Sequence, residues 1–443
     1  MKYLKTIKNN INLKELLLGS FTTFIIKITG MTLGYIVVLL ISRNYGAYGT
    51  GVYSLALNLL LSLSVFCAFG LDVMILRYVG QYGLENNNNH KLRNIYYQIL
   101  SVTIPLSILV AIILYLSSNF ITEYFFKNED YSIILKICAV GLPFFTAGII
   151  NVEFLRGAKK IKISEFYRSV MRPLGVFTVL LFLNKDEDIS RVIVGLVLAI
   201  FLSFVGSLLP VHNIINNISK NIDKQKKHIK TSKLLKEATP MMMIMVVNTL
   251  LISLASFMIE WFKTSKEVGV FNVSLKIAQI VSLVLTVVNV IAAPKFAELF
   301  WNDKIEELKK FIRYSSKLIF FGCSVMSLFI IIFSRELLLF FGEEFINGRI
   351  PLIILVIGQI VNSASGSVGM FMNMTGNQNA FKNIIILVLL FVTVSYLIFI
   401  PMFEGVLGAA IVFSLGAVIL NVSSVIYVYK KLKIRTYYLP FIR

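Results

Sequence analysis

The sequence is poor in charge and in the residue types on which catalysis and metal binding depend. Only 15% of the 443 residues are charged, and there are three histidines and three cysteines, whereas soluble domains carry about a quarter charged residues. Cys67, Cys138 and Cys323 stand singly in apolar segments, so we interpret them as small core residues rather than as ligands or disulfide partners. No nucleophile and base pair and no glycine-rich nucleotide loop stands out. We therefore expect a protein that is not an enzyme and that binds neither a metal nor another cofactor.

Apolar sequence is what the chain has in abundance. Hydrophobic residues make up 57% of it, and the mean hydropathy is +0.80. Segments such as 95–116 and 384–402 have the length of about 20 residues that a helix needs to cross the hydrocarbon core. The alternation typical of membrane β-strands is not seen. The sequence predicts an all-α integral membrane protein with about twelve transmembrane helices, at 17–42, 50–76, 95–118, 131–155, 165–184, 190–214, 238–261, 267–294, 316–341, 350–374, 383–403 and 405–429.

The positive charge is distributed unevenly over the predicted loops. A formal net charge of +20 in a soluble protein would suggest a nucleic-acid partner. Here most Lys and Arg residues lie at the termini and in the even-numbered loops, whereas the odd-numbered loops are short and collect acids. By the positive-inside rule we expect both termini in the cytoplasm and no nucleic-acid partner. The basic segment 154–173, FLRGAKKIKISEFYRSVMRP, is then foremost a cytoplasmic turn.

The two halves of the chain resemble each other. GVYSLALNLLLSLS at 51–64 aligns with GVFNVSLKIAQIVS at 269–282, a shift of 218 residues. Two further pairs match at the same or nearly the same shift, Arg77 with Lys295 and Gly157 with Gly376. The repeat predicts two six-helix lobes, 1–215 and 238–443. Because six is an even number, both lobes enter the membrane in the same direction, a parallel repeat found in transporters with the substrate site between the halves.

The basic segment 216–237 is the predicted cytoplasmic linker between the lobes. Its charge fits contact with anionic membrane lipids better than a specific partner site.

Two lysines lie deep in predicted spans, where an ionised side chain costs about 2.5–3.5 kcal/mol on insertion scales. Lys27 shares a helix face with Gly30 and Gly34, and Lys276 shares one with Asn272 and Gln279. The tenth span carries a third polar stripe, which includes Gln359 and Asn362. A cavity lined by cations and amides prefers an anion, and phosphate or pyrophosphate suits such donors. The alternative, helix interfaces held by small residues and hydrogen bonds, remains open and is the interpretation we prefer for the two glycines.

Acidic residues in the spans are few and lie near the span ends. They are Asp72, Glu153, Glu165, Glu260 and Glu336. We expect Asp72 to pair with Arg77, and Glu153 to pair with Arg156, on the cytoplasmic side.

Three stretches resemble a known family. GAYGTGVYSLALNLLLSLSVFCAFGLDVMILRYVG, FLRGAKK and IAAPKFAEL resemble the polysaccharide-transporter branch of the multidrug, oligosaccharidyl-lipid and polysaccharide (MOP) exporter superfamily, over nearly the whole chain. Members are bacterial inner-membrane flippases that move undecaprenyl-pyrophosphate-linked oligosaccharides to the outer leaflet for O-antigen or capsule biosynthesis. The resemblance implies two six-helix lobes in a MATE-like V around a central cavity, which works by alternating access.

The resemblance also implies that cations of the first, second, seventh and eighth helices contact the pyrophosphate. Lys27 and Lys276 stand at suitable places, whereas the repeat aligns Lys276 with Asn58, so the second helix lacks the cation that some relatives have. The predicted substrate-binding residues are Lys27, Asn58, Asn272, Lys276, Gln279, Gln359 and Asn362, and the predicted cytoplasmic entrance comprises Arg77, Arg156 and Lys295. The expected partners are the lipid-linked oligosaccharide and, as a candidate, a polysaccharide polymerase. The coupling cation, Na⁺ or H⁺, is left open.

Two other functions are considered. An ion-coupled exporter of small molecules from the same superfamily would share the architecture, but that branch usually uses acidic residues within the lobes, which the sequence lacks. A membrane-bound polysaccharide polymerase or ligase needs catalytic residues outside the bilayer, usually on a large loop, and the odd-numbered loops are too short for one.

Overall fold

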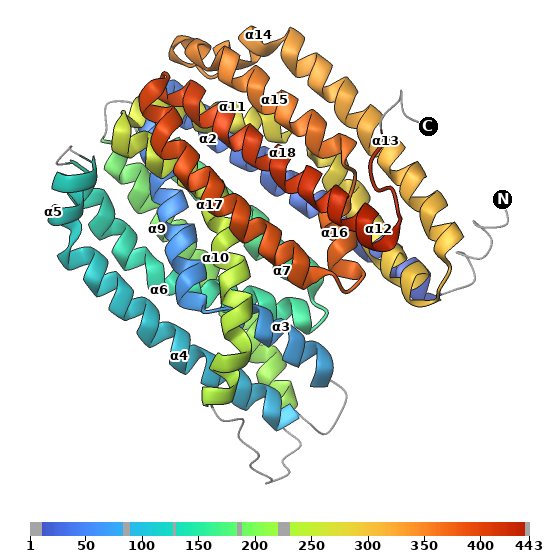
Figure 1. Cartoon of the computed structure of the whole chain (residues 1–443). Coiled ribbons are helices and arrows are strands. Elements are labelled where there is room, and N and C mark those ends of the chain that lie inside the picture. Colours follow the sequence, from blue (N-terminus) through green and yellow to red (C-terminus); the bar gives the residue numbers. More distant parts are fainter. Residues whose placement is uncertain (1–10, 83–88, 127–129, 184–187, 220–230, 439–443) are drawn as a thin grey trace. The chain divides into compact units, whose positions relative to one another are not determined.

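The computed structural model describes residues 11–82, 89–126, 130–183, 188–219 and 231–438 (Figure 1). Every regular element in these ranges is a helix. They divide into two compact units, unit 1 with Met1–Leu40 and Ala56–Thr249, and unit 2 with Ile41–Leu55 and Leu250–Arg443. The lobe bounds 1–215 and 238–443 stay a prediction. Of the linker predicted at 216–237, the ends belong to helices, and 220–230 lie outside the described residues.

Unit 1 is built around three long helices. Figure 1 shows α4, α6 and α9 side by side, and α6 packs against both of the others. The elements of this unit are parts of α2 (Ile11–Ala68), then α3 (Leu71–Tyr82), α4 (Asn89–Leu116), α5 (Ser118–Ile121), η1 (Thr122–Phe126), α6 (Asp130–Gly157), α7 (Ile161–Glu165), η2 (Phe166–Val170), α8 (Met171–Phe182), α9 (Ile189–Ser219) and the first part of α10 (Thr231–Phe262). Asn151 of α6 ties the three together, because it accepts from the Tyr96 hydroxyl at 2.6 Å and donates to Ser207 at 2.8 Å.

Unit 2 is centred on α15, which packs against α11, α13 and α18, while α17 packs along α18. Its elements are the middle of α2, the end of α10, α11 (Ser265–Gln279), α12 (Leu283–Trp301), α13 (Ile305–Ile332), α14 (Ser334–Leu339), η3 (Glu343–Gly348), α15 (Arg349–Ala364), α16 (Val368–Met374), α17 (Gln378–Met402) and α18 (Gly405–Leu432).

The helices account for the predicted spans. Nine helices in the described ranges are long and apolar enough to cross a membrane, or ten if α11 and α12, bent by 50°, form one span. The 58-residue α2 is two helices that meet at Gly46, where φ is 64° and ψ is −163°, a conformation that glycine adopts without steric cost. The span predicted at 165–184 is interrupted, because the π-helix η2 separates α7 from α8. Cys67, Cys138 and Cys323 are buried free thiols, as predicted.

A symmetric close contact supports the sequence repeat. A Cβ atom on Gly51 would overlap the carbonyl oxygen of Ser265, and one on Gly269 would overlap that of Ala47. Gly51 and Gly269 are separated by the predicted shift of 218 residues, and so are Ala47 and Ser265. The two copies of the motif therefore contact each other through equivalent backbone atoms.

The turn after α6 recurs after α16. Lys159 (φ 59°) and Gly376 (φ 75°) both adopt the left-handed conformation, and in each turn the next residue donates its N–H to the carbonyl five positions earlier, at 2.9 Å. This hydrogen bond defines a Schellman helix end. The structural shift is 217 residues, so the predicted match of Gly157 with Gly376 is wrong by two positions. The sequence alignment matched Gly157 with Gly376, whereas the backbone conformation shows that Gly376 is equivalent to Lys159.

Candidate functional site

The two intraspan lysines belong to different units. Lys27 is exposed on the first helix of α2, in unit 1, and Lys276 is half-buried on α11, in unit 2. Gly30, one turn beyond Lys27, lies against η2, because a Cβ at this glycine would overlap the backbone carbonyl of Ser169. The small residue thus serves a close helix contact, which is the role preferred for it from the sequence. Asn58, the repeat partner of Lys276, is half-buried in unit 1.

The amides of unit 2 make hydrogen bonds within and between helices. Asn272 of α11 donates to Ser256 of α10 at 3.0 Å and to the Val268 carbonyl at 2.9 Å. Asn362 donates to Gln359, one turn earlier on α15, at 3.2 Å. These bonds favour the alternative, interhelical hydrogen bonding, for Asn272. Because α11 packs against α15, both polar stripes lie on neighbouring helices.

Gln279 is the last residue of α11. It is half-buried, and the chain bends by 50° directly after it. The side-chain hydroxyl of Ser282, within this bend, donates to the Gln279 carbonyl at 2.7 Å.

The three residues of the predicted entrance have different environments. Arg77 of α3 is exposed. Lys295 of α12 pairs with Glu298 at 2.8 Å, one turn on. Arg156 pairs with Glu153 at 3.7 Å, which confirms one of the two predicted ion pairs.

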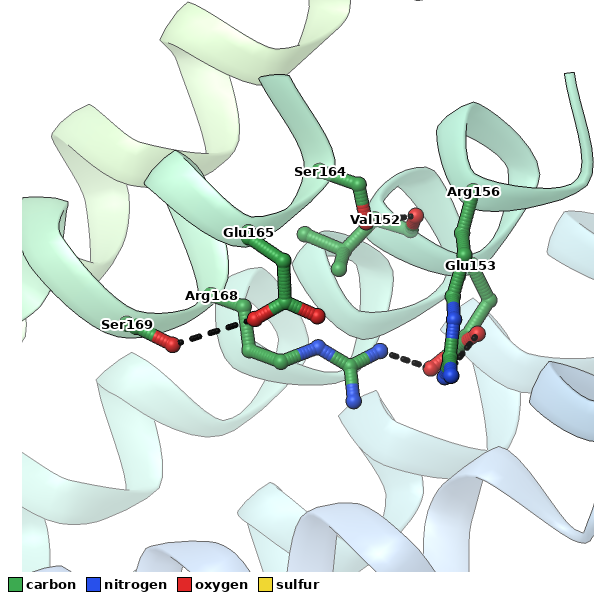
Figure 2. Close-up of polar contacts among 7 residues, drawn as sticks. All are labelled: Val152, Glu153, Arg156, Ser164, Glu165, Arg168 and Ser169. Carbon is green, nitrogen blue, oxygen red and sulfur yellow. Dashed lines mark hydrogen bonds and ion pairs between the residues drawn. The ribbon is translucent and has the colours of Figure 1, made fainter. Parts of the chain in front are cut away.

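The structure reveals a charged cluster around Glu153, of which only the pair with Arg156 was predicted from the sequence. Figure 2 shows Glu153 of α6 between Arg156 and Arg168, and the Arg168 guanidinium is paired with the Glu153 carboxylate. Glu153 is buried, with 8% of its surface exposed. Alongside, Ser169 donates to Glu165 at 3.3 Å, so a second polar contact of η2 lies next to the charged cluster (Figure 2).

Local backbone structure brings this cluster together. The Schellman turn after α6 reverses the chain, and η2 then presents Arg168 toward α6 (Figure 2). Most π-helical turns occur as single interruptions, frequently at functional sites. A Cβ on Gly157 would overlap the Val79 side chain, so α6 approaches α3 closely at the same level. This contact places α3, with Asp72 at its first turn, beside the cluster.

A cavity of about 240 Å³ adjoins the cluster within unit 1. Its lining combines apolar aromatic rings with four charged side chains, namely Phe144, Phe145, Tyr167, Phe204, Asp72, Glu153, Arg168 and Arg172. The Arg172 guanidinium lies 5.4 Å from the centroid of the Phe145 ring, a cation–π contact.

Asp72 departs from the sequence prediction. Its side chain is 5% exposed, and one carboxylate oxygen, Oδ1, is buried without a hydrogen-bond partner among the described residues. The predicted pair of Asp72 with Arg77 is wrong: five residues turn a helix by about 140°, and Arg77 points to the exposed side. The expectation that a lobe lacks internal carboxylates is also wrong, because Asp72 and Glu153 are both buried in unit 1.

Comparison with known proteins places the chain in a family. The model of the family described as polysaccharide biosynthesis protein matches residues 16–300, well over half of the chain. The chain belongs to this polysaccharide biosynthesis family. The predicted resemblance is thereby confirmed. No curated protein sequence matches the chain significantly.

Solved structures share the fold of this family member. A lipid II flippase, MurJ, in an inward closed conformation has a TM-score of 0.72 at 16% identity, covering 93% of this chain and 87% of that one. A multidrug resistance MATE transporter of the MOP superfamily, in an inward-facing conformation, has a TM-score of 0.74 at 14% identity, covering 94% and 98%. A MOP superfamily transporter from Pyrococcus furiosus has a TM-score of 0.64 at 12% identity, covering 94% and 95%.

These comparisons confirm the fold class, an all-α multi-pass membrane protein with the MOP transporter fold. The polysaccharide biosynthesis family and its structural neighbours are transporters and flippases rather than catalytic enzymes, in agreement with the sequence prediction.

Proposed function

We propose that the protein is a flippase that moves undecaprenyl-pyrophosphate-linked oligosaccharide units across the bacterial inner membrane by alternating access, for O-antigen or capsule assembly. The family match over residues 16–300 carries this proposal. The fold that the chain shares with a protein described as a lipid II flippase supports it.

The charge of the substrate explains the intraspan lysines. A pyrophosphate that crosses the hydrocarbon core needs cationic partners, since an isolated charge there is costly. Lys27 is exposed on a predicted membrane helix, and Lys276 follows one turn after Asn272. In the proposed mechanism both ammonium groups bind the pyrophosphate as point charges. The amides Asn58, Gln279, Gln359 and Asn362 contact the saccharide or the phosphate oxygens.

The proposal includes an orientation. Both termini lie in the cytoplasm, and Arg77, Arg156 and Lys295 receive the anionic headgroup on that side. Anionic lipids contact the basic segment 216–237, and a polymerase takes over the flipped unit. Reporter fusions at the two ends that both show cytoplasmic activity would agree with this orientation.

The flippase function is tested by surface polysaccharide in a deletion strain complemented with variants. Lys27→Ala and Lys276→Ala are each expected to abolish the polysaccharide while the protein remains in the membrane. The matched control is Lys136→Ala, because this third intraspan lysine already binds Asn119 Oδ1 at 3.4 Å and lies 5.9 Å from the Tyr115 ring centroid. Full polymer with either cavity variant would contradict the assigned site.

The cavity of unit 1 favours a second candidate, an ion-coupled exporter of small molecules. Its aromatic rings suit apolar molecules, and the buried carboxylates of Asp72 and Glu153 are acidic residues within a lobe, which that branch usually uses. Drug resistance on overexpression, with normal surface glycan after deletion, would favour this function over the flippase.

A further inference from the structure

The cavity in unit 1 contains a carboxylate that the fold leaves incompletely paired. Asp72 lines the cavity and is buried to 95%, and its Oδ1 atom has no hydrogen-bond partner among the described residues. A buried carboxylate oxygen without a hydrogen-bond partner is costly, although a backbone hydrogen bond from Val73 acts on the same carboxylate. Buried polar atoms without a partner are rare in native structures and often mark a functional role.

The charges around Asp72 come from three packed elements. Glu153 of α6 repels its negative charge, and Arg168 of η2 attracts it. Arg172 of α8 lines the cavity but stacks on Phe145. From α2 and α9 the lining receives no titratable side chain.

The remaining titratable groups of these elements have their own contacts. The Tyr167 hydroxyl donates to the Gly206 carbonyl at 2.9 Å, and Glu165 accepts from Ser169. On α10, Glu237 accepts from Tyr78, farther along α3.

Arg168 is therefore paired with one acid, Glu153, and attracts the negative charge of a second, Asp72. Its guanidinium is paired with Glu153, which Arg156 also approaches. Two carboxylates that share one main cation in a buried site cannot both remain ionised without cost. A proton on Asp72 removes this repulsion and leaves the pair of Glu153 with Arg168 intact.

A metal ion fits this site less well than a proton does. The guanidinium groups of Arg168 and Arg172 line the same cavity and repel a cation. No group of three or more His, Cys, Asp and Glu residues in the described ranges is placed to hold a metal. A proton needs only one oxygen, and the hydroxyl that it forms is a donor.

We propose that Asp72 is a proton-binding site of the transport cycle, with Glu153 and Arg168 as the charged groups that set its two states. The ionised carboxylate takes one proton from water, forming an O–H bond, and returns it to water when the cavity opens to the other side. This inference goes beyond the proposed flippase function, because it holds for any transported substrate.

The site has a physical connection to the helix that carries Lys27. Ser169, next to Arg168 on η2, packs its carbonyl against Gly30, one turn from Lys27. Single π-helical turns within α-helices are rare and are frequent at functional sites, so η2 is the segment that shifts in this proposal. Neutralising Asp72 removes a negative charge that attracts Arg168, and in this proposal a shift of η2 then moves the backbone against which α2 packs.

The test is a pH titration of the purified full-length protein, followed by infrared difference spectroscopy of the carboxylic acid C=O stretch. The protein is produced with ¹³C in the aspartate side-chain carboxyl groups. The chain has six aspartates, Asp72, Asp130, Asp186, Asp188, Asp223 and Asp303. Solvent-exposed aspartates stay ionised above about pH 5.5, since their ordinary pKa is about 3.9. A single titrating band between about pH 5.5 and 9 that shifts with the aspartate label is expected, and Asp72→Asn removes it.

The controls separate the possible outcomes. Asp188→Asn and Asp303→Asn change exposed aspartates and should keep the band. If Asp72→Asn does not fold, Asp72→Glu makes the assignment, because the band should then follow a glutamate label instead of the aspartate label. The proposal is overturned by the absence of a label-sensitive band, by a band of the wild-type protein that shifts with labelled glutamate instead, or by one that responds to sodium concentration rather than to pH. None of these readouts uses the transported substrate, so a failure here is distinct from a failure of the flippase function.

Discussion

Gly51 and Gly269 pack backbone against backbone. The space that a Cβ atom on either glycine would fill is already taken by backbone atoms of the other motif copy. Both residues open the repeated GV-aromatic motif, and each approaches the carbonyl oxygen four residues before its partner. Because backbone atoms cannot rotate away as a side chain can, the contact requires glycine at both positions. The repeat is thus expressed in the fold as an interface between its own two copies.

Gly51→Ala is expected to destabilise the protein by about 2–3 kcal/mol or more, since overpacking alone costs about 1–3 kcal/mol and here the obstacle is backbone. Thermal unfolding of the purified protein in detergent measures the loss. Gly34→Ala is the matched control, because no atom lies within 4 Å of its added Cβ. Equal unfolding temperatures for the two variants would show that the contact is not as close as described.

Arg168→Ala is expected to lower the free energy of unfolding by about 2 kcal/mol. Breaking a fully buried pair costs about 3–5 kcal/mol, and the Arg168 side chain is 39% exposed. Arg156→Ala removes a longer and more exposed contact with the same Glu153 and should cost about 0–1 kcal/mol. Chemical denaturation of Arg168→Ala, of Glu153→Gln and of the double variant gives the coupling energy between the two side chains. If the double variant loses as much free energy of unfolding as the two single variants together, the two side chains are not coupled, which would argue against the ion pair.

The two equivalent helix ends should respond to substitution with opposite signs. Lys159→Gly is expected to stabilise the protein by about 1 kcal/mol, because a non-glycine residue in the left-handed conformation costs about 1–2 kcal/mol. Gly376→Ala is expected to destabilise it by a similar amount, since Gly376 has φ of 75°.

Lys160→Gly is the control for Lys159→Gly. Lys160 has φ of −86°, so a glycine there relieves no left-handed strain. Thermal unfolding distinguishes the variants. A loss of stability in Lys159→Gly would contradict the strain assigned to that turn.

Local sequence patterns predict the membrane helices and one of the ion pairs of this structure. Hydropathy gave the membrane helices, and the spacing of polar residues gave the stripes around Lys27 and Lys276. The ion pair of Glu153 with Arg156 was predictable, because residues three apart share a helix face. The predicted pair of Asp72 with Arg77 failed for the same geometric reason, because residues five apart do not share a helix face.

Arg168 was missed because its partner lies across a chain reversal. Nothing in the basic turn distinguishes Arg168 from the lysines around it, and only the Schellman turn and η2 bring it to Glu153. Asp72 stands still farther away in sequence. Its role depends on the close approach of α3 to α6 at Gly157, which no local pattern reveals.

The most direct measurement of the proposed function is the leaflet in which the lipid-linked oligosaccharide accumulates. In a deletion strain, the undecaprenyl-pyrophosphate-linked unit should be protected from an external glycosidase or periodate until the membrane is opened. Expression of the wild-type protein should make it accessible, whereas Lys27→Ala should not. Accessibility that is the same with and without the protein would contradict the flippase function.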